Sequence, residues 1–300
     1  MNQNILFLLI TSAFSILSCN LKSNANSDDN RYRKFGIKKE VILKYSFKFG
    51  EPAEHGEIFS EKTFDKEGKI TEFIEHFGNA FIKHKYYYNS AGNIAKIIDS
   101  TRTESESITI NNYDTRNKFS YESHYNQDGS LAWKRYYNYN ELDSLISEFV
   151  VTSKRDTPLI TFYNYNKQTD HLEMKTQIQG IDTTIEKYKF DNNQRVCETF
   201  LPKNGQRYLS NYDKKGNLTF WANITENNDT LQSEEYTFSE TSQLLKVKRM
   251  QTYFDITQKT YYQEIFSYKS KGILESKQSY EFIASSFEPT ELYKYQYEYH

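Results

Sequence analysis

Hydrophobic and polar residues alternate along most of this chain, and a period of two residues is typical of a β-strand rather than of a helix. Simple alternation around Tyr86 puts this residue on one face with Ile98 and puts Tyr87 on the other face with Ile97. Both faces therefore carry apolar residues. No window shows a sustained 3.6-residue pattern with helix caps, and the many Tyr, Phe, Thr and Ile residues favour strands. The pattern predicts an all-β protein.

A seven-residue motif separates the alternating segments: an aromatic residue, Asp or Asn, two polar residues, Gly, a polar residue and an aliphatic residue. Its clearest copy is Tyr212–Leu218, and further copies start at Phe64, Tyr88, Tyr113, Tyr125, Tyr139, Phe190, Phe238 and Tyr268, with a one-residue insertion in the copy at Tyr165. Glycine fills the fifth position in five of these ten copies, whereas chance would place about 0.4 of a glycine there in a chain that has only 11. The chain is therefore built from repeats.

The motif has the chemistry of a tight β-hairpin turn. The Asp or Asn side chain can bond the backbone two residues further on, and glycine tolerates the left-handed conformation that closes a type I turn with a bulge. Asn117 and Asp143, which replace glycine in two copies, also accept positive φ. Gln194 and Ser242 suit that conformation less well, so we expect their turns to be built differently.

The spacing of the motifs indicates the architecture. Most copies start about 25 residues apart, which is enough for two strands, a tight turn and a looser return. The close pair at Tyr113 and Tyr125 indicates successive turns on opposite edges of the sheet, and residues 104–110 form one of the polar return loops. We expect one antiparallel β-meander of repeated hairpins that curls into a continuous sheet, with a β-propeller-like arrangement as the alternative.

The last segment alternates strictly, with Tyr293, Tyr295, Tyr297 and Tyr299 on one face. The chain stops where the next turn would begin. We interpret the segment as a half-repeat that pairs with the preceding hairpin and caps the array, because a long unpaired edge promotes aggregation.

The N-terminus has the features of an export signal. Ile5 to Leu17 is a mostly apolar run, too short to span a membrane and of the right length for a signal-peptide core. The following Ser18 and Cys19 resemble the lipobox of bacterial lipoproteins, in which the cysteine is diacylated and becomes the new N-terminus. The alternative is an ordinary secretory signal with an incidental cysteine. We expect a signal peptide over residues 1–18, a lipid-anchored flexible tether over 19–37 and a single β-repeat domain over 38–300.

Composition narrows the class of protein. Hydrophobic residues make up 37% and aromatic residues 16% of the chain, including 26 Tyr, which predicts a thin core built from tyrosine rings. The net charge of −2 gives no basic footprint for nucleic acid. Lipid on Cys19 would leave Cys197 without a disulfide partner, and we interpret Cys197 as a small buried side chain.

The motif resembles the YD repeat of Rhs-type proteins and, more loosely, the hairpin repeats of MORN-like and YwqK-like antitoxin families. Tyr212–Leu218 and Tyr88–Ile94 match best, and the similarity extends in degenerate form from Phe64 to Lys277. The resemblance implies an all-β meander that curls as hairpins are added. It does not imply the toxin-carrier role of large Rhs proteins, because this chain has too few repeats to enclose another domain and has no extra domain after them.

The sequence contains no recognisable catalytic motif: phosphate-binding loops, a nucleophile elbow and zincin ligands are all absent. His76 and His84, with Glu75 beside them, are the closest candidates for a metal site, and we interpret them as solvated strand residues. We therefore expect no enzyme activity, no cofactor and no metal.

A series of tyrosines two residues before the motif aromatic is the main candidate for binding: Tyr86, Tyr137, Tyr163, Tyr188 and Tyr236. These rings form either the packed inner face of a curled sheet or an open platform for sugar rings or an extended partner. We expect a lipid-anchored binding module of the bacterial cell envelope, attached to the membrane through Cys19, whose partner is a glycan or an envelope protein. The alternatives are an immunity or antitoxin-like inhibitor and, with no motif in favour, an enzyme acting on envelope polysaccharide.

Overall fold

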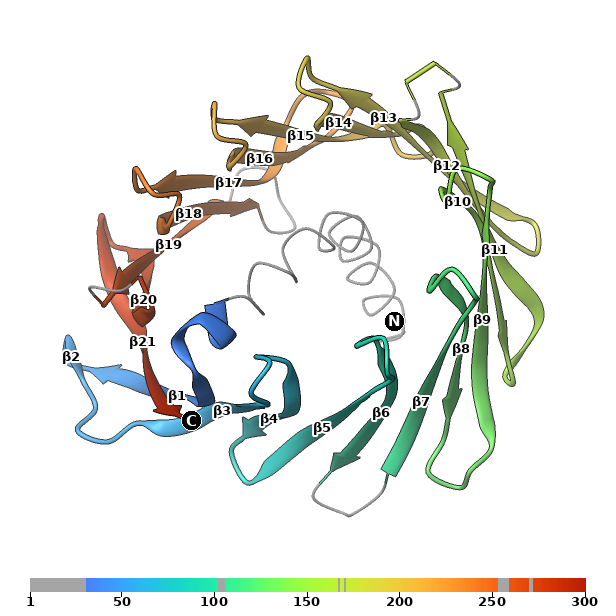
Figure 1. Ribbon diagram of the computed structural model, residues 1–300. Coiled ribbons are helices and arrows are strands. Elements are labelled where there is room, and N and C mark those ends of the chain that lie inside the picture. The colour runs from blue at the N-terminus through green and yellow to red at the C-terminus, as the bar shows by residue number, and fades with distance from the viewer. Residues whose placement is uncertain (1–30, 102–105, 167, 170, 253–258, 270–271) are drawn as a thin grey trace.

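The computed structural model describes residues 31–101, 106–166, 168–169, 171–252, 259–269 and 272–300. These residues form a closed antiparallel β-barrel of twenty strands (Figure 1). The strands follow one another around the wall in chain order, and β1 closes the ring by pairing with β21 on one side and β3 on the other. A two-residue strand, β2, pairs with the end of β1.

The barrel strands are β1 (Ile37–Lys48), β3 (Glu57–Phe64), β4 (Ile70–Phe77), β5 (Ala80–Tyr88), β6 (Ile94–Thr101), β7 (Glu106–Tyr113), β8 (Phe119–Tyr125), β9 (Leu131–Tyr139), β10 (Leu145–Thr152), β11 (Arg155–Tyr165), β12 (Leu172–Gln179), β13 (Asp182–Phe190), β14 (Val196–Leu201), β15 (Gln206–Tyr212), β16 (Leu218–Ile224), β17 (Thr230–Phe238), β18 (Leu244–Thr252), β19 (Lys259–Tyr268), β20 (Leu274–Ile283) and β21 (Ser286–Tyr299), and β2 is Glu51–Pro52.

The all-β prediction is confirmed, but the expected open meander is wrong, and so is the propeller-like alternative. The C-terminal half-repeat pairs with the preceding hairpin, as expected, through β20 and β21. It does not cap a free edge, because β21 also pairs with β1 from Ile37 opposite Tyr299 to Ser46 opposite Glu291. Closure gives both terminal strands a partner and removes the two edges that an open sheet would expose.

The motif turns have the predicted geometry. The fifth residue has positive φ in every copy without an insertion, from 63° at Asp143 to 89° at Gly216. Gln194 and Ser242 were expected to differ, and this expectation is wrong: their φ values are 64° and 63°, and their amides donate to Asp191 and Ser239 as glycine amides do in the other turns. The local hydrogen bonds of the turn therefore impose the left-handed conformation even on residues that disfavour it.

Because successive turns alternate between the two ends of a barrel, nine of the motif turns lie at one end, which we call the motif rim. The turn after Tyr125 connects β8 to β9 at the opposite end, as expected from its short spacing after Tyr113. The interpretation of residues 104–110 as a return loop is wrong in part, because residues 106–110 belong to β7.

A bulge follows most motif turns and changes which residues share a face. Tyr88 lies opposite Ile94, but Tyr87 lies opposite Lys96 and Tyr86 opposite Ile97. Ile97 therefore shares a face with Tyr86, and the assignment from simple alternation is wrong, because the extra residue of the bulge reverses the alternation beyond the turn.

The inner face of the wall can be identified from the start of the described chain. A helical turn over residues 31–35 lies inside the ring beside β1 and β3 (Figure 1, blue). Its Tyr32 stacks on Phe64 with 4.0 Å between ring centroids, and both pack with Ile37 and Ile273 in the buried apolar cluster of the barrel. Phe64 therefore points inward, and the strand registers assign all other inward residues, among them the other aromatics of the motif rim. Tyr125, whose turn lies at the opposite end, points outward because it lies opposite the outward Ile108.

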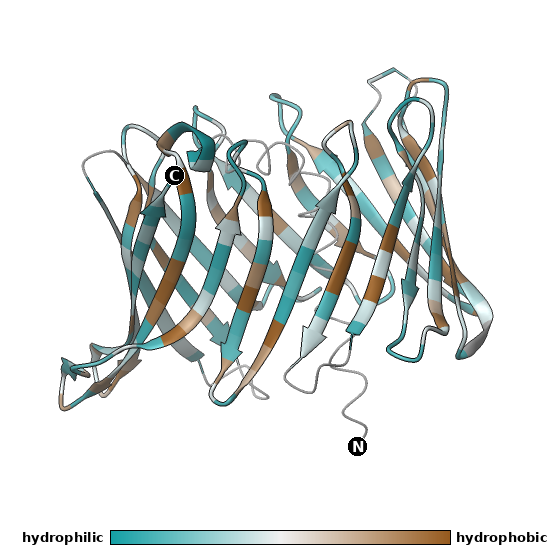
Figure 2. Ribbon diagram, turned by 60° about the horizontal axis from the view of Figure 1, so that its bottom comes forward, coloured by the Kyte–Doolittle hydropathy of each residue, from teal (hydrophilic) through white to brown (hydrophobic). Residues whose placement is uncertain are grey.

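The outer face carries apolar side chains, such as Ile98 and Phe162, as well as charged ones. Figure 2 shows hydrophobic and hydrophilic residues interleaved along the strands. Outward ion pairs join Lys39 to Glu61 at 2.6 Å and Lys83 to Glu72 at 2.8 Å. Among the described residues, no helix has the length and apolar character needed to cross a membrane.

Candidate functional site

The five candidate tyrosines all lie on the inner face of the barrel. Tyr86 pairs with Ile97, Tyr137 with Glu148, Tyr163 with Lys175, Tyr188 with Thr199 and Tyr236 with Val247, each two residues before a motif aromatic. All five are half-buried. The structure thus brings them onto one concave surface, where each ring packs against the wall and keeps part of its area open to the interior.

Four of these tyrosines donate hydrogen bonds to glutamates of the same face. The hydroxyl of Tyr137 donates to Glu122 at 3.2 Å, and that of Tyr163 donates to Glu148 at 3.0 Å. Tyr188 donates to Glu186 at 2.6 Å, and Tyr236 donates to Glu234. Each bond holds a carboxylate in a defined orientation on the inner face.

Burial and the nearby carboxylates raise the pKa of the hydroxyls of Tyr86, Tyr137 and Tyr236. For Tyr137 the loss of solvent raises the pKa first and Glu122 raises it further; for Tyr236 burial and the hydrogen bond to Glu234 have the same effect. Burial also raises the pKa of Tyr139, the motif aromatic two residues after Tyr137, to about 12. The phenols therefore remain protonated donors at neutral pH.

An ion-pair network crosses the inner face from β17 to β1. Arg249 lies 2.9 Å from Glu234 and 2.7 Å from Glu264, and Glu264 also accepts from Lys277 at 3.0 Å. Lys44 and Glu291 form a pair at 2.5 Å beside the ring of Tyr293. In this network the carboxylates of Glu234, Glu264 and Glu291 each have a cationic neighbour.

Both tryptophans of the chain are also on the inner face. Trp133 pairs with His124 and Thr152, and its ring stacks on the imidazole of His124 at 5.4 Å. Trp221 pairs with Ser210 and stacks on Tyr208 at 5.8 Å. The tryptophans were not identified as inward residues from the sequence. Trp133 alternates with Tyr139, and Trp221 lies beyond the bulge that follows Tyr212, so both could have been placed on the inner face if the bulge had been known.

The two histidines that sequence analysis considered together lie on opposite faces of the sheet. His84 points inward and its Nδ1 lies 2.6 Å from Asp99, whereas His76 points outward and its Nε2 lies 3.0 Å from Glu61. They do not share a ligand. Within the described ranges, no group of three or more His, Cys, Asp or Glu side chains is arranged to hold a metal ion.

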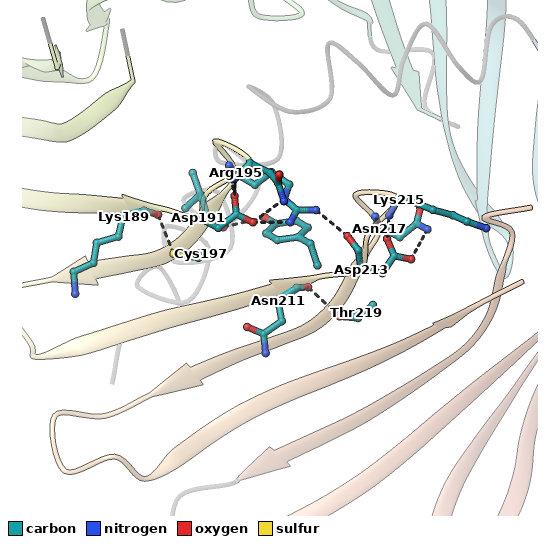
Figure 3. Close-up of polar contacts among 12 residues, drawn as sticks. Lys189, Asp191, Arg195, Cys197, Asn211, Asp213, Lys215, Asn217 and Thr219 are labelled. Atoms are coloured by element: carbon teal, nitrogen blue, oxygen red, sulfur yellow. Dashed lines mark hydrogen bonds and ion pairs between the residues drawn. The ribbon is translucent and has the colours of Figure 1, made fainter. Parts of the chain in front are cut away.

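Cys197 lies on β14, two residues before Thr199, which is opposite the inward Tyr188. Cys197 is half-buried rather than fully buried, and its thiol lies 3.5 Å from the carbonyl of Lys189 (Figure 3). Cys19, the predicted site of lipidation, lies outside the described residues.

The motif rim is held together by bonds from turn to turn. Asp213 accepts from the amides of Lys215 and Asn217 in its own turn, while Arg195 of the preceding turn donates to the carbonyl of Asp213 at 3.0 Å (Figure 3). The side-chain amide of Asn217 also donates a hydrogen bond to the hydroxyl of Ser242, in the next turn, at 3.1 Å. These bonds order the rim by joining each turn to its neighbours.

Comparison with known proteins finds no matching family model and no matching curated protein. Among solved structures, the chain is similar to TcdB2-TccC3 without its hypervariable C-terminal region, with a TM-score of 0.40, 15% identity, and coverage of 84% of this chain and 14% of that one. It is also similar to a porin-like protein from Bacteroides uniformis, with a TM-score of 0.38, 8% identity, and coverage of 88% of this chain and 97% of that one. At these TM-scores neither similarity bears on function, and the inner face has to be judged by its own chemistry.

Proposed function

We propose that this protein is a binding protein of the bacterial cell envelope, anchored to a membrane by lipid on Cys19, that holds its ligand against the inner face of the barrel. The observation that carries the proposal is the inward ring of half-buried tyrosines with carboxylates bonded to their hydroxyls. Aromatic faces beside oriented polar groups are the usual composition of sites for small molecules and extended chains.

The width of the barrel supports an internal site. A barrel of eight strands has an interior that side chains just fill, and the diameter grows with the number of strands. A barrel of twenty strands therefore has a much wider interior. Solvent reaches the inward charged groups: the side chains of Arg135 and Asp99 are 39% and 29% exposed. A ligand inside the barrel would therefore meet aromatic and ionic groups together.

The outer face supports attachment beside the membrane rather than insertion into it. Lys83 and Lys246 lie on outward positions of β5 and β18, and the outward Glu61 has two partners, Lys39 and His76. A lysine facing lipid at the bilayer midplane costs about 2–4 kcal/mol. A lipid on Cys19, joined through a polar tether, would hold such a barrel at the membrane surface.

A protein partner is the alternative to a glycan. The resemblance of the motif to YD repeats and to antitoxin families favours an inhibitor of an envelope-targeted protein, and an inhibitor would engage a folded domain rather than a chain inside the barrel. Enzyme activity on polysaccharide has no further support from the inner face.

The anchor is tested by labelling with fatty acid in a bacterial host. Wild-type protein should incorporate the label and partition into detergent, whereas Cys19→Ser should do neither, because stable attachment needs the acyl chains. Equal labelling of the two proteins would exclude the lipoprotein assignment.

The binding site is tested with inner and outer variants of neighbouring residues. Tyr137→Ala and Tyr163→Ala remove inward rings, and Tyr136→Ala and Phe162→Ala remove the outward rings beside them. On arrays of glycans and envelope proteins, the inner variants should lose retention and the outer variants should keep it. Loss on the outer variants alone would place the ligand on the outside and refute the proposal.

A further inference from the structure

The charged residues of the inner face are not evenly distributed. On four alternate strands, β4, β6, β8 and β10, a carboxylate points inward near the middle of the wall: Glu75, Asp99, Glu122 and Glu148. We call this surface the acidic sector. Alternate strands lie about 10 Å apart, so these carboxylates form a series of separate charges along the curved sheet.

The intervening strands do not neutralise the acidic sector. Inward positions opposite the carboxylates hold Ser107 and Asn111 on β7 and Thr161 on β11. Among the described inward side chains of β4 to β11, the lysine or arginine is Arg135 on β9. Arg135 is 4.0 Å from Glu122. The imidazole of His84 on β5 lies 2.6 Å from Asp99. Four carboxylates against one guanidinium and this imidazole still leave the sector with an excess of negative charge.

Elsewhere on the inner face, acidic side chains form ion pairs with basic ones. On β12 and β13, Lys175 pairs with Glu186, and on β1 and β3 the side chain of Glu40 lies 3.4 Å from Lys62. Together with the network around Arg249, these pairs match the inward acids near the middle of the wall with bases, whereas Glu281 and Glu288 lie opposite each other at the end of β20 and β21. The excess on β4 to β11 is therefore a local feature and not a property of the repeat.

Aromatic rings and unused acceptors accompany the carboxylates. Tyr86, Trp133, Tyr137 and Tyr163 lie on the same face, and rings of this kind attract cations through their π-electrons. Asn111 of β7, between the strands of Asp99 and Glu122, is only 8% exposed, and its Oδ1 has no hydrogen-bond donor. The hydroxyl oxygen of Thr152, opposite Trp133, is likewise buried without a partner.

From this arrangement we infer that the acidic sector binds an extended basic peptide, whose ammonium groups meet the carboxylates while its side-chain stems lie along the aromatic rings. Three residues of an extended chain span about 10 Å, so the long side chains of a lysine-rich peptide can place an ammonium group near each of the successive carboxylates. A donor-rich chain also suits a surface with unused acceptors. The inference rests on the proposed function, because it names the class of ligand for the same inner face.

The experiment measures binding of hexalysine by calorimetry at low salt, with N-acetylated hexalysine as the uncharged control. Wild-type protein should bind hexalysine at least tenfold more tightly than the acetylated peptide. The double variant Glu122→Gln/Glu148→Gln should lose at least tenfold in affinity, whereas Arg135→Met should bind more tightly, because it removes the competing cation.

The matched control is Glu235→Gln/Glu298→Gln, which removes two exposed carboxylates from outward positions and should leave affinity unchanged. Circular dichroism and gel filtration check the fold of each variant, and the comparison of the two peptides on wild-type protein needs no variant at all. Equal binding of the two peptides, no binding of hexalysine, or equal losses in the inner and outer variants would overturn the inference. Retention of a neutral glycan that depends on Tyr137 and Tyr163 would then leave the proposed function intact.

Discussion

The hydroxyl of Tyr88 donates a hydrogen bond to the backbone carbonyl of Ile70 at 2.6 Å. Ile70 is the seventh residue of the preceding motif, so the bond joins one hairpin to the one before it. The same relationship joins Tyr113 to Ile94 at 2.8 Å. It recurs from Tyr165 to Leu145, Tyr212 to Val196, Tyr268 to Leu244 and Tyr297 to Leu274. The motif aromatic therefore both packs on the inner face and links consecutive repeats.

Tyr88→Phe should lower the free energy of unfolding by about 1 kcal/mol, since it removes one hydrogen bond and leaves the ring in place. Tyr87→Phe, on the exposed outer side of the same strand, is the control and should have no measurable effect. Urea denaturation of both variants checks the prediction. Equal midpoints for the two would show that the link contributes nothing to stability.

The positive φ at the fifth motif position should determine how substitutions there change the stability of the protein. Gly216 has φ of 89°, and an added Cβ would meet no atom closer than 3.9 Å, so Gly216→Val should cost about 1–3 kcal/mol through backbone strain alone. Gln194→Gly should stabilise the protein by up to about 1 kcal/mol, because glycine relieves the positive φ there. Lys214→Val, at an exposed position of the same turn as Gly216, is the control. A Gln194→Gly variant with a lower melting temperature would contradict this account.

Much of the fold was predictable because it is encoded locally. The alternation predicted strands, and the motif predicted turns, down to the left-handed residue at Gly92. Closure was not predictable, because β1 and β21 are separated by most of the chain and an edge strand alternates in the same way as a paired one. The acidic sector was also hidden, because a bulge after each turn determines whether Glu122 or its neighbour faces inward.

The turn inside the barrel should be essential for closure. Tyr32 is 6% exposed and stacks on Phe64, and its hydroxyl lies 3.1 Å from Glu40 of β1. Tyr32→Ala should therefore lower the free energy of unfolding by about 3–5 kcal/mol, in the range for buried aromatic residues. Arg33→Ala, on the exposed side of the same turn, should cost little. Comparable thermal midpoints for both variants would place the helical turn outside the cooperative fold.

Acid should weaken the ion-pair network around Glu264. Burial favours the neutral acid, but Lys277 and Arg249 outweigh it and hold the pKa of Glu264 below its ordinary value of 4.5. A carboxyl group whose pKa is lower in the folded state than in the unfolded state stabilises the fold at pH values above its unfolded pKa. This stabilisation is lost as the pH falls through the folded pKa. Thermal melts below about pH 4.5 should therefore show falling stability, and Glu264→Gln should flatten that decline. Glu235→Gln, on the outer face, should reproduce the wild-type curve, and an unchanged curve for Glu264→Gln would refute the assignment.

The pair of Lys175 and Glu186 is the most deeply buried ion pair on the inner face, with side chains 5% and 7% exposed and 3.4 Å between Nζ and Oε1. Taking one partner away leaves a buried charge, which costs about 3–5 kcal/mol, whereas replacing both with neutral residues of similar size costs far less. Lys175→Met should therefore destabilise the barrel strongly. The double variant Lys175→Met/Glu186→Gln should recover most of the loss, because the Gln amide oxygen can still accept from Tyr188 as Glu186 does. A double-mutant cycle by urea denaturation measures the coupling. If the double variant is as unstable as Lys175→Met or more so, the pair contributes through packing rather than through charge, and the balanced part of the inner face would need a different explanation.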